Sequence, residues 1–254
     1  MKIYGWKNII VSFCLGGGLL YGGVHGEWGY SGDASPDRWG DLKPEFFMCK
    51  EGKNQSPINI TGSDVVAANG LEEIKFHYTS HATNAVNNGH AVKVDVANGS
   101  FIEIDGIQFE LKQFHFHSPS ENTIEGKYFP LEAHFVHQSK DGQLAVVSVM
   151  YEEGKENKIL KKICSTIFSA IDKVHQCKLK ADDINALLPK KRDYYRFSGS
   201  LTTPPCSEGV RWFVLKEYKE VSKEQIEKFV NVMMKGRNNR PVQPLNARKV
   251  MKNQ

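Results

Sequence analysis

Alternation of hydrophobic and polar residues in the first half of the chain predicts a series of short strands. Segment 92–96 places valine at every second position with charged residues between, which is the period-two pattern of a half-buried strand. We interpret Asn98-Gly99 as a hairpin turn into a strand over 101–104, and Asp105-Gly106 as the next turn. This region therefore predicts a meander of antiparallel strands.

The following strand, 107–117, changes its pattern halfway. Successive side chains of a strand point to opposite faces, so we place all odd positions of this segment on one face. Those positions are hydrophobic as far as Leu111 and polar from Gln113 onward, where phenylalanine takes the even positions. His115 and His117 are thus predicted to lie on one face of the strand.

Two more strands are predicted at 131–137 and 144–151, and the second is hydrophobic enough to be central in a sheet. Helical spacing predicts an amphipathic helix over 156–174, and a second helix over 222–234 begins with the capping-box pair Ser222 and Gln225. The chain has no internal repeat and no linker rich in Pro, Gly or Ser. We therefore expect one mainly β (α+β) domain, with a large, twisted, mostly antiparallel central sheet and short peripheral helices.

The N-terminus has the features of a secretory signal peptide. Two lysines precede a hydrophobic run over 9–20 that is too short and too rich in glycine to span a bilayer comfortably. An uncleaved anchor and lipid attachment at Cys14 are the alternatives, and the large phenylalanine before that cysteine disfavours the second. We predict a signal peptide over 1–26 and an exported domain over 27–254, periplasmic or extracellular, with no stable membrane span.

Charge and cysteine content narrow the classes of function. Lys and Arg number 33 against 29 Asp and Glu, and the predicted signal peptide contains two of the lysines and no acid. The nearly balanced charge that remains argues against a basic face for nucleic acid. Four of the five cysteines lie after the signal peptide, an even number that permits disulfides in an oxidising compartment. Their spacing alone does not set the pairing.

The pair His115 and His117 suits a metal ion. Residues two apart on a strand project from one face with their roots roughly 6–7 Å apart, so two imidazoles can converge on one ion. Zinc at catalytic sites takes three protein ligands and keeps one position open. His134, in the next predicted strand, can supply the third ligand after a loop and an antiparallel return. Gln113 and Glu132 share faces with these histidines and are placed to bind their second ring nitrogens.

Five short motifs occur in order between about Trp28 and Pro244, which is essentially the whole mature chain. They are Gln55-Ser-Pro-Ile-Asn-Ile60, Asn88-Gly-His90, Gln113-Phe-His115-Phe-His117, Glu132-Ala-His134-Phe-Val136-His137 and Gly199-Ser-Leu-Thr-Thr-Pro-Pro205. In sequence, order and spacing they resemble motifs of the α-class carbonic anhydrases, in particular the exported bacterial type.

That resemblance implies a zinc enzyme that interconverts carbon dioxide and bicarbonate in a cone whose zinc is held on the sheet. His115, His117 and His134 match the zinc ligands, and a zinc-bound hydroxide is then the nucleophile. Thr202 matches the threonine that orients this hydroxide, and Glu121 matches the buried carboxylate that receives the proton of the threonine.

The resemblance also implies the rest of the pocket. The residues that match the substrate site are Val136, Val146, Leu201, Thr202, Thr203, Val210 and Trp212. His90 matches the proton shuttle. Lys93 stands where many members carry a neutral amide, and a cation there is expected to weaken the ordered waters of the shuttle or to lower the pKa of His90.

Cysteine pairing and partners follow from the same source. Cys49 and Cys206 match the disulfide of exported members. Cys164 and Cys177 have no such match, and both a second disulfide and two buried thiols are compatible with the sequence. Sulfonamides or small anions are the expected inhibitors at the zinc, no nucleic-acid partner is expected, and a homodimer is one option for the assembly.

Two other classes of function fit the sequence less well. A catalytically silent binding module on the same fold would lack one or more ligands, but the three histidines, Glu121 and Thr202 are all present. A zinc peptidase of the common type needs His-Glu-x-x-His, which does not occur in this sequence. Slow ester hydrolysis stays open as a secondary activity of the same site.

Overall fold

The computed structural model describes residues 28–167, 171–232 and 236–253. The signal peptide predicted for residues 1–26 lies outside these ranges. A search of the described ranges finds no helix with the length and hydrophobicity needed to cross a membrane.

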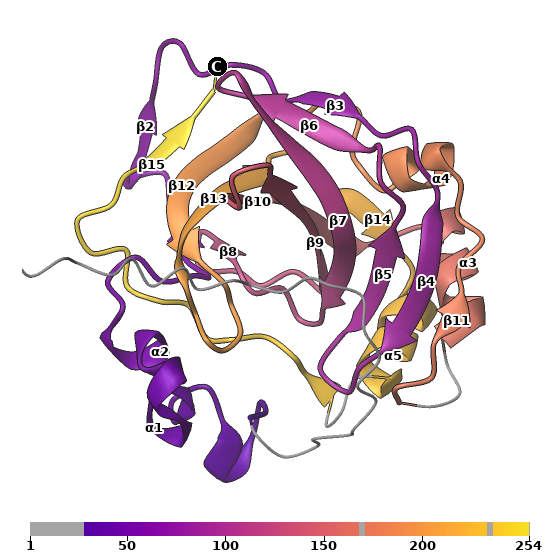
Figure 1. Cartoon of the computed structure of the whole chain (residues 1–254), viewed down its shortest axis with the longest axis horizontal. Helices are drawn as coiled ribbons and strands as arrows, with labels where there is room; N and C mark the ends of the chain where they lie inside the picture. Colours follow the sequence, from indigo (N-terminus) through magenta and orange to yellow (C-terminus); the bar gives the residue numbers. More distant parts are fainter. Residues whose placement is uncertain (1–27, 168–170, 233–235, 254) are drawn as a thin grey trace, which may run out of the picture.

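Within the described residues, a mixed sheet of thirteen strands forms the body of the domain (Figure 1). Its main path runs β11-β4-β5-β7-β9-β10-β13-β12-β15-β2, and β3, β6 and β14 pair off this path. Parallel pairing joins β10 to β13 and β14, and β15 to β2, while the other neighbours are antiparallel. The prediction of a mainly β domain with a mostly antiparallel central sheet is confirmed.

The strands have the following bounds: β1 Asn59–Ile60, β2 Val65–Ala67, β3 Lys75–His77, β4 Ala82–Asn87, β5 Val92–Val96, β6 Phe101–Ile104, β7 Ile107–His117, β8 Thr123–Ile124, β9 Leu131–Ser139, β10 Leu144–Glu153, β11 His175–Gln176, β12 Tyr194–Ser200, β13 Glu208–Leu215, β14 Lys219–Val221 and β15 Val250–Lys252. β1 and β8 form a separate two-stranded sheet. The predicted central strand is β10, which lies between β9 and β13.

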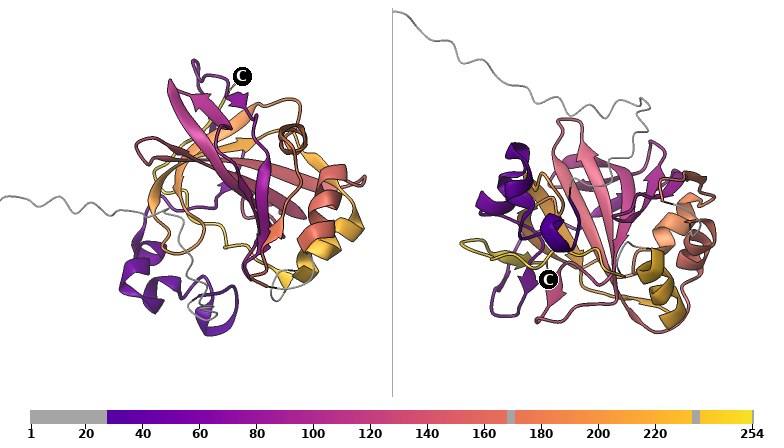
Figure 2. Two further views of the ribbon diagram at one scale, coloured as in Figure 1. Left: turned by 45° about the vertical axis from the view of Figure 1, so that its right-hand side comes forward. Right: turned by 90° about the horizontal axis from the view of Figure 1, so that it is seen from below.

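Short helices lie at two sides of the sheet (Figure 2). They are α1 Trp39–Leu42, α2 Met48–Glu51, α3 Lys158–Ile167, α4 Ala181–Ala186 and α5 Lys223–Val232, with 3-10 turns at Gly32–Ala34 and Pro44–Phe46. α1 and α2 lie at one side of the molecule, and α3, α4 and α5 gather at the other beside β4 and β11 (Figures 1 and 2).

The turn predicted at Asn98-Gly99 does not form a hairpin. β5 and β6 do not pair with each other: both run antiparallel to β7, β5 beside 113–116 and β6 beside 107–110. The two strands thus run in one direction along β7, interrupted where Gly99 has a φ of +109°. The Asn-Gly pair does contain a residue in a left-handed conformation. That residue separates β5 from β6, which pair one after the other with β7. Asp105-Gly106 does form the predicted two-residue turn, since Ile104 pairs with Ile107.

The pattern change in β7 is a β-bulge. Leu111 pairs with His137 and Gln113 with Val136, so Lys112 is an extra residue in the ladder. The prediction that all odd positions of 107–117 share one face is therefore wrong. Burying a phenylalanine contributes about 1.5–3 kcal/mol, and strict alternation through Lys112, with no bulge, would turn Phe114 and Phe116 to the histidine side.

The helix predicted over 156–174 is shorter than expected. Asn157 caps its start, because its Oδ1 accepts from the amides of Ile159 and Leu160 at 3.1 Å. Further on, Asp172 has a φ of +60°, a left-handed conformation that cannot continue a helix. The capping box of α5 is confirmed by paired bonds between Ser222 and Gln225.

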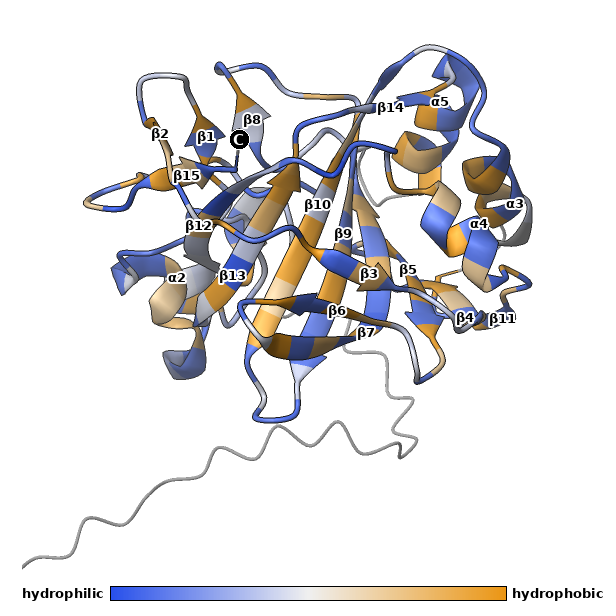
Figure 3. Cartoon of the chain, turned by 90° about the horizontal axis from the view of Figure 1, so that it is seen from above, coloured by the Kyte–Doolittle hydropathy of each residue, from blue (hydrophilic) through white to orange (hydrophobic). Residues whose placement is uncertain are grey.

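Two hydrophobic clusters occupy the two faces of the sheet. The larger one lies between the sheet and α3, α4 and α5, and includes Leu111, Phe114 and Phe116. The smaller one lies on the opposite face and includes Val146 and Trp212. β10 contributes to both, and hydrophobic colours dominate it in Figure 3.

A disulfide joins Cys49 at α2 to Cys206 in the loop before β13. The pairing implied by the family resemblance is thus confirmed, and it closes a span of 157 positions. Cys164 and Cys177 are separate thiols, both buried. Burial raises the pKa of each thiol, to about 12 for Cys164, so both are protonated near neutral pH.

Candidate metal centre

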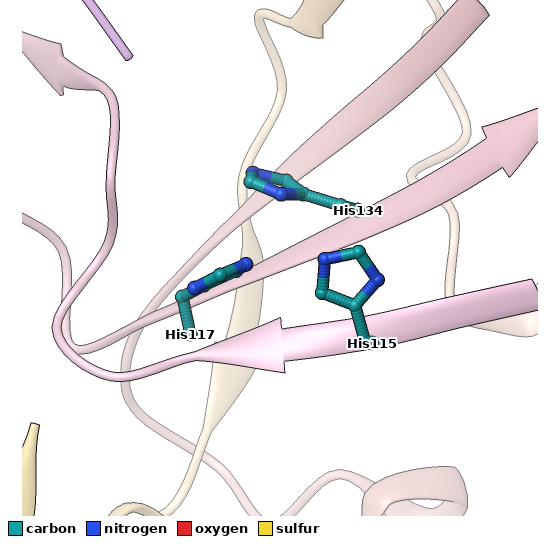
Figure 4. A group of neighbouring side chains, drawn as sticks. All are labelled: His115, His117 and His134. Atoms are coloured by element: carbon teal, nitrogen blue, oxygen red, sulfur yellow. The ribbon is translucent and has the colours of Figure 1, made fainter. Parts of the chain in front are cut away.

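Three histidines meet on the face of the sheet that carries the smaller cluster. His115 on β7 pairs directly with His134 on β9, and His117 follows two residues after His115. One ring nitrogen from each lies within 4.8 Å of the other two, and the rings converge in Figure 4. Both features depend on the bulge in β7, which turns the two histidines of that strand toward the face that His134 occupies.

The remaining ring nitrogens are held by the protein. His115 Nδ1 donates to Gln113 Oε1 at 2.9 Å, His117 Nδ1 to the carbonyl of Asn238 at 2.8 Å, and His134 Nε2 to Glu132 Oε1 at 2.8 Å. These bonds leave Nε2, Nε2 and Nδ1 respectively for a shared ligand. His117 Nε2 is buried and has no hydrogen-bond partner. A bound metal ion would satisfy this nitrogen.

Glu132 is the most firmly held carboxylate of the site. Its Oε2 accepts from the amides of Glu121 and Asn122, and its Oε1 accepts from the side chains of Asn122 and Ser148 as well as His134. Burial raises the pKa of Glu132, but His134 and the hydrogen bonds from His134, Ser148 and Asn122 outweigh it and lower the pKa to about 2. Glu132 is therefore an anion that orients His134 and favours binding of a cation.

Glu121 lies at the back of the triad. Its Oε2 is 3.5 Å from His117 Nε2 and 3.8 Å from His134 Nδ1, and its Oε1 accepts from the amide of Arg240 at 2.9 Å. Burial raises the pKa of this carboxyl to about 7, although His134, the Arg240 amide and the side chain of the buried Thr202 lower it. Glu121 and Thr202 are thus close neighbours.

A cavity of about 190 Å³ opens over His115 and His117 of the triad. Its walls are Trp28, Tyr30, Asn88, His90, Ala91, Lys93, Gln113, His115, His117 and Thr203. His90 stacks on Trp28 with ring centroids 3.9 Å apart and an interplanar angle of 15°. Burial chiefly, and then the charges of His117, His134 and Lys93, lower the pKa of His115 well below its ordinary value, so this imidazole is neutral and able to bind a metal.

The hydrophobic residues predicted for the substrate pocket belong to the smaller cluster. They are Val136, Val146, Leu201, Val210 and Trp212. A cross-strand row on β7, β9, β10 and β13 places Gln113, Val136, Val146 and Trp212 side by side. The Trp212 ring lies edge-on to His134 at 4.9 Å between centroids, so the row ends against the triad.

Several residues of the site were not predicted from the sequence. The carbonyl of Asn238, which holds His117, lies 121 positions away, and a backbone carbonyl leaves no residue-type signal. Asn122 and Ser148 reach Glu132 through tertiary packing alone. Trp28 begins the family resemblance, but its stacking on His90 in the cavity wall follows only from the tertiary structure.

His137 and His77 lie away from the triad. His137 is buried on the opposite face, where its Nε2 bonds Tyr78 Oη at 2.7 Å, in agreement with the structural role predicted for it. His77 stacks on Phe101.

The model of the family described as eukaryotic-type carbonic anhydrase matches residues 34–254. The chain belongs to this family. A carbonic anhydrase from Neisseria gonorrhoeae is 48% identical over 231 residues, which are 90% of this chain and 89% of that protein. The carbonic anhydrase of Thermovibrio ammonificans, solved with the inhibitor sulfanilamide, is 54% identical with a TM-score of 0.86, over 91% of this chain and all of that one. A structure of dioscorin complexed with ascorbate is 33% identical with a TM-score of 0.83, over 89% of this chain and 97% of that one.

The metal of this family is zinc, and the residues of this chain fit it. Three neutral imidazole nitrogens are a ligand set of catalytic zinc sites. The unpartnered Nε2 of His117, and the acceptors fixed on the far nitrogen of each histidine, are the observations that support the fit.

Proposed function

We propose that this chain catalyses the reversible hydration of carbon dioxide to bicarbonate and a proton. The observation that carries the proposal is the triad, with one ring nitrogen of each histidine turned inward and the other held by an acceptor. Zinc, when bound by these three residues, would act as a Lewis acid that lowers the pKa of water to about 7, the value general to carbonic anhydrases.

Thr202 and Glu121 orient the attack. Glu121 Oε2 faces the triad and has no hydrogen-bond partner among the described atoms, so it can accept the proton of the Thr202 hydroxyl. Thr202 Oγ1 is then left with its lone pairs toward the cavity, where it fixes the direction of the nucleophile. Fixed orientation of reacting groups lowers the barrier because less entropy is lost on reaching the transition state.

The hydrophobic row beside the triad suits carbon dioxide. Val136, Val146 and Trp212 present no charged or donor group toward an uncharged substrate other than the Trp212 indole, whose N–H already donates to the carbonyl of Ser200 at 3.0 Å. We place carbon dioxide between this row and His134, with Leu201, Val210, Thr203 and the amide of Thr202 completing its site. The polar wall across the cavity is left for protons and bicarbonate.

His90 is the proton shuttle in this proposal. Histidine is the side chain whose ordinary pKa lies nearest neutrality, and His90 lies on the cavity wall away from the hydrophobic row. Its stacking on Trp28 holds the ring at the wall. A proton can pass from the cavity to His90 and then to solvent.

The finer attributes follow as proposals. The Cys49–Cys206 disulfide supports an oxidising location, and so a periplasmic or extracellular one. Sulfonamides and small anions are proposed inhibitors, since sulfanilamide is named with the Thermovibrio relative. We propose slow ester hydrolysis as a secondary activity, and a homodimer as the assembly to be tested.

A catalytically silent binding module is the alternative. Dioscorin has this fold and is named with ascorbate, so membership of the fold alone does not carry the activity. The complete triad and the Glu121–Thr202 neighbours favour the enzyme.

Stopped-flow hydration of carbon dioxide by the domain 27–254, with and without a zinc chelator, tests the proposal. We expect hydration that the chelator abolishes and added zinc restores. Folded protein with stoichiometric zinc and no hydration above buffer would contradict it. Thr202→Ala is expected to slow turnover about a hundredfold with zinc retained, whereas the neighbouring Thr203→Ala is expected to have a smaller effect.

A further inference from the structure

We propose that Lys93 makes the polar wall of the cavity a subsite for a small oxyanion, and that bicarbonate is the ligand it takes. The inference rests on the proposed function and adds a residue that stabilises the complex with one of the two substrates. Lys93 lies on β5 directly across from His115 of β7, and both side chains line the same cavity. A charge on this residue is therefore presented to the space above the triad.

The charge of Lys93 has little competition within the cavity wall. Of the ten described residues that line the cavity, Lys93 is the only Lys, Arg, Asp or Glu. Its Nζ pairs with Asp95 Oδ1 at 3.0 Å, two residues along the same strand and across from Gln113. An ammonium group has three donors, so the bond to Asp95 leaves donors for a ligand.

Solvent access allows such a ligand to reach Lys93. The side chains of Lys93 and Asp95 are 35% and 37% exposed, so neither is locked in the core. A pair this open contributes little to stability, typically below about 1 kcal/mol. The ion pair with Asp95 therefore does little to explain why a lysine lines the cavity. Contact between Lys93 and an anionic ligand explains it better.

The two substrates of the reaction differ in charge, and this difference gives the proposal its signature. Carbon dioxide is neutral and does not respond to the Lys93 charge, whereas bicarbonate is attracted by it. Loss of the charge should raise the KM for bicarbonate and leave kcat/KM for carbon dioxide nearly unchanged. Because the equilibrium constant links the two directions, kcat for dehydration should then rise together with the KM for bicarbonate. Because Asp95 competes for the same ammonium group, loss of its charge should lower the KM for bicarbonate.

Lys93→Gln tests this, with Lys75→Gln as the matched control. Lys75 pairs with Glu103 at 2.7 Å on β3, where its side chain is 64% exposed, so both variants lose one positive charge and one ion pair. At fixed ionic strength we expect Lys93→Gln to raise the KM for bicarbonate about 3- to 10-fold, and Lys75→Gln to leave it unchanged. Lys93→Arg should retain the wild-type value, and Asp95→Asn should lower it.

Calorimetric titration of the zinc-loaded protein gives a readout that does not depend on turnover. Benzenesulfonamide and 4-carboxybenzenesulfonamide differ by one carboxylate, and we expect the preference for the second to fall about 3- to 10-fold in Lys93→Gln and to persist in Lys75→Gln. An unchanged KM and preference in Lys93→Gln, or equal shifts in both glutamine variants, would overturn the subsite. A wild-type protein that binds both sulfonamides but hydrates no carbon dioxide would contradict the proposed function, and the titration would still decide the role of Lys93.

Discussion

His134 and His137 are both buried on β9, three positions apart, and they lie on opposite faces of the sheet. His134 has Glu132 on Nε2 and turns Nδ1 toward the triad. His137 uses both nitrogens within the protein, Nε2 with Tyr78 Oη at 2.7 Å and Nδ1 with the carbonyl of Ala145 at 3.3 Å. Burial alone thus does not distinguish a ligand from a structural histidine. For these two residues the difference is the nitrogen turned toward the other histidines of the triad, since a buried nitrogen without a partner also occurs at His175 Nε2.

The two faces also differ in how they treat charge. On the His134 face, Glu132 is held as an anion by four donors besides His134. On the other face, burial lowers the pKa of His137 to about 3, although carbonyl groups of Ala145 and Phe135 oppose this shift. One face is built to accept a cation, and the other excludes a proton.

Removing one ligand should have the largest effect. His134→Ala is expected to lower zinc affinity by more than the roughly 10- to 100-fold that loss of a supporting partner costs, and to abolish hydration of carbon dioxide. Metal analysis of the purified protein and stopped-flow assay check this. Retention of stoichiometric zinc would remove His134 from the ligand set, and His137→Ala is the control that should keep both metal and activity.

Loss of the histidine on the other face should affect stability and leave the metal in place. His137→Phe leaves Tyr78 Oη buried without its partner, which costs about 1–3 kcal/mol in the free energy of unfolding. Urea denaturation with intact zinc content checks this. A loss of zinc equal to that in His134→Ala would show that the two faces are not independent.

The contribution of His137 to stability should also appear in the pH dependence of unfolding. The imidazole of His137 has an ordinary pKa of 6.5 and a pKa of about 3 in the folded protein, so the unfolded chain binds more protons between these values. The stabilisation is complete above pH 6.5 and is lost as the pH falls toward 3, at about 1.4 kcal/mol per pH unit. Urea denaturation between pH 7 and 4.5 should show a shallower loss in His137→Gln than in the wild type, and parallel curves would argue against this assignment.

The smallest effect is expected from Ser148→Ala. Ser148 Oγ donates to Glu132 Oε1 at 2.5 Å, but four other donors remain on that carboxylate. We expect zinc affinity to fall less than the tenfold lower limit for loss of a whole supporting residue. Competition with a zinc chelator measures it, and a loss as large as that in Glu132→Gln would mean that Ser148 alone sets the charge of Glu132.

Much of this contrast could be predicted from the sequence. The spacing of His115, His117 and His134 indicated a common face, and the opposite orientation of His137 followed from strand alternation. Residues two apart, and neighbours across one turn, are local relations that a pattern records. The hairpin at Asp105-Gly106 belongs to the same class.

The rest depended on contacts between distant segments. The turn at Asn98-Gly99 was misread because the signal fixes a backbone conformation and not the strand that pairs next. The helix over 156–174 was predicted too long because hydrophobic spacing continued beyond the point where Asp172 reverses the backbone. The carbonyl of Asn238 could not be predicted, since any residue type offers one.

Because Lys112 is an extra residue, the face on which each β7 side chain lies depends on its position relative to the bulge. Side chains alternate between the core and the cavity, and the bulge shifts that alternation by one between Leu111 and Gln113. Substitutions along β7 alter one position each, whereas deletion of one residue from 107–111 or from 113–117 would exchange the faces of the residues between the deletion and the end of the strand. Deletion of Lys112 would instead leave a regular strand in which Leu111 still faces the core and Gln113 the cavity. Insertions and deletions elsewhere in this strand are therefore the changes that the fold tolerates least, and the metal centre depends on the number of residues before it as much as on their identity.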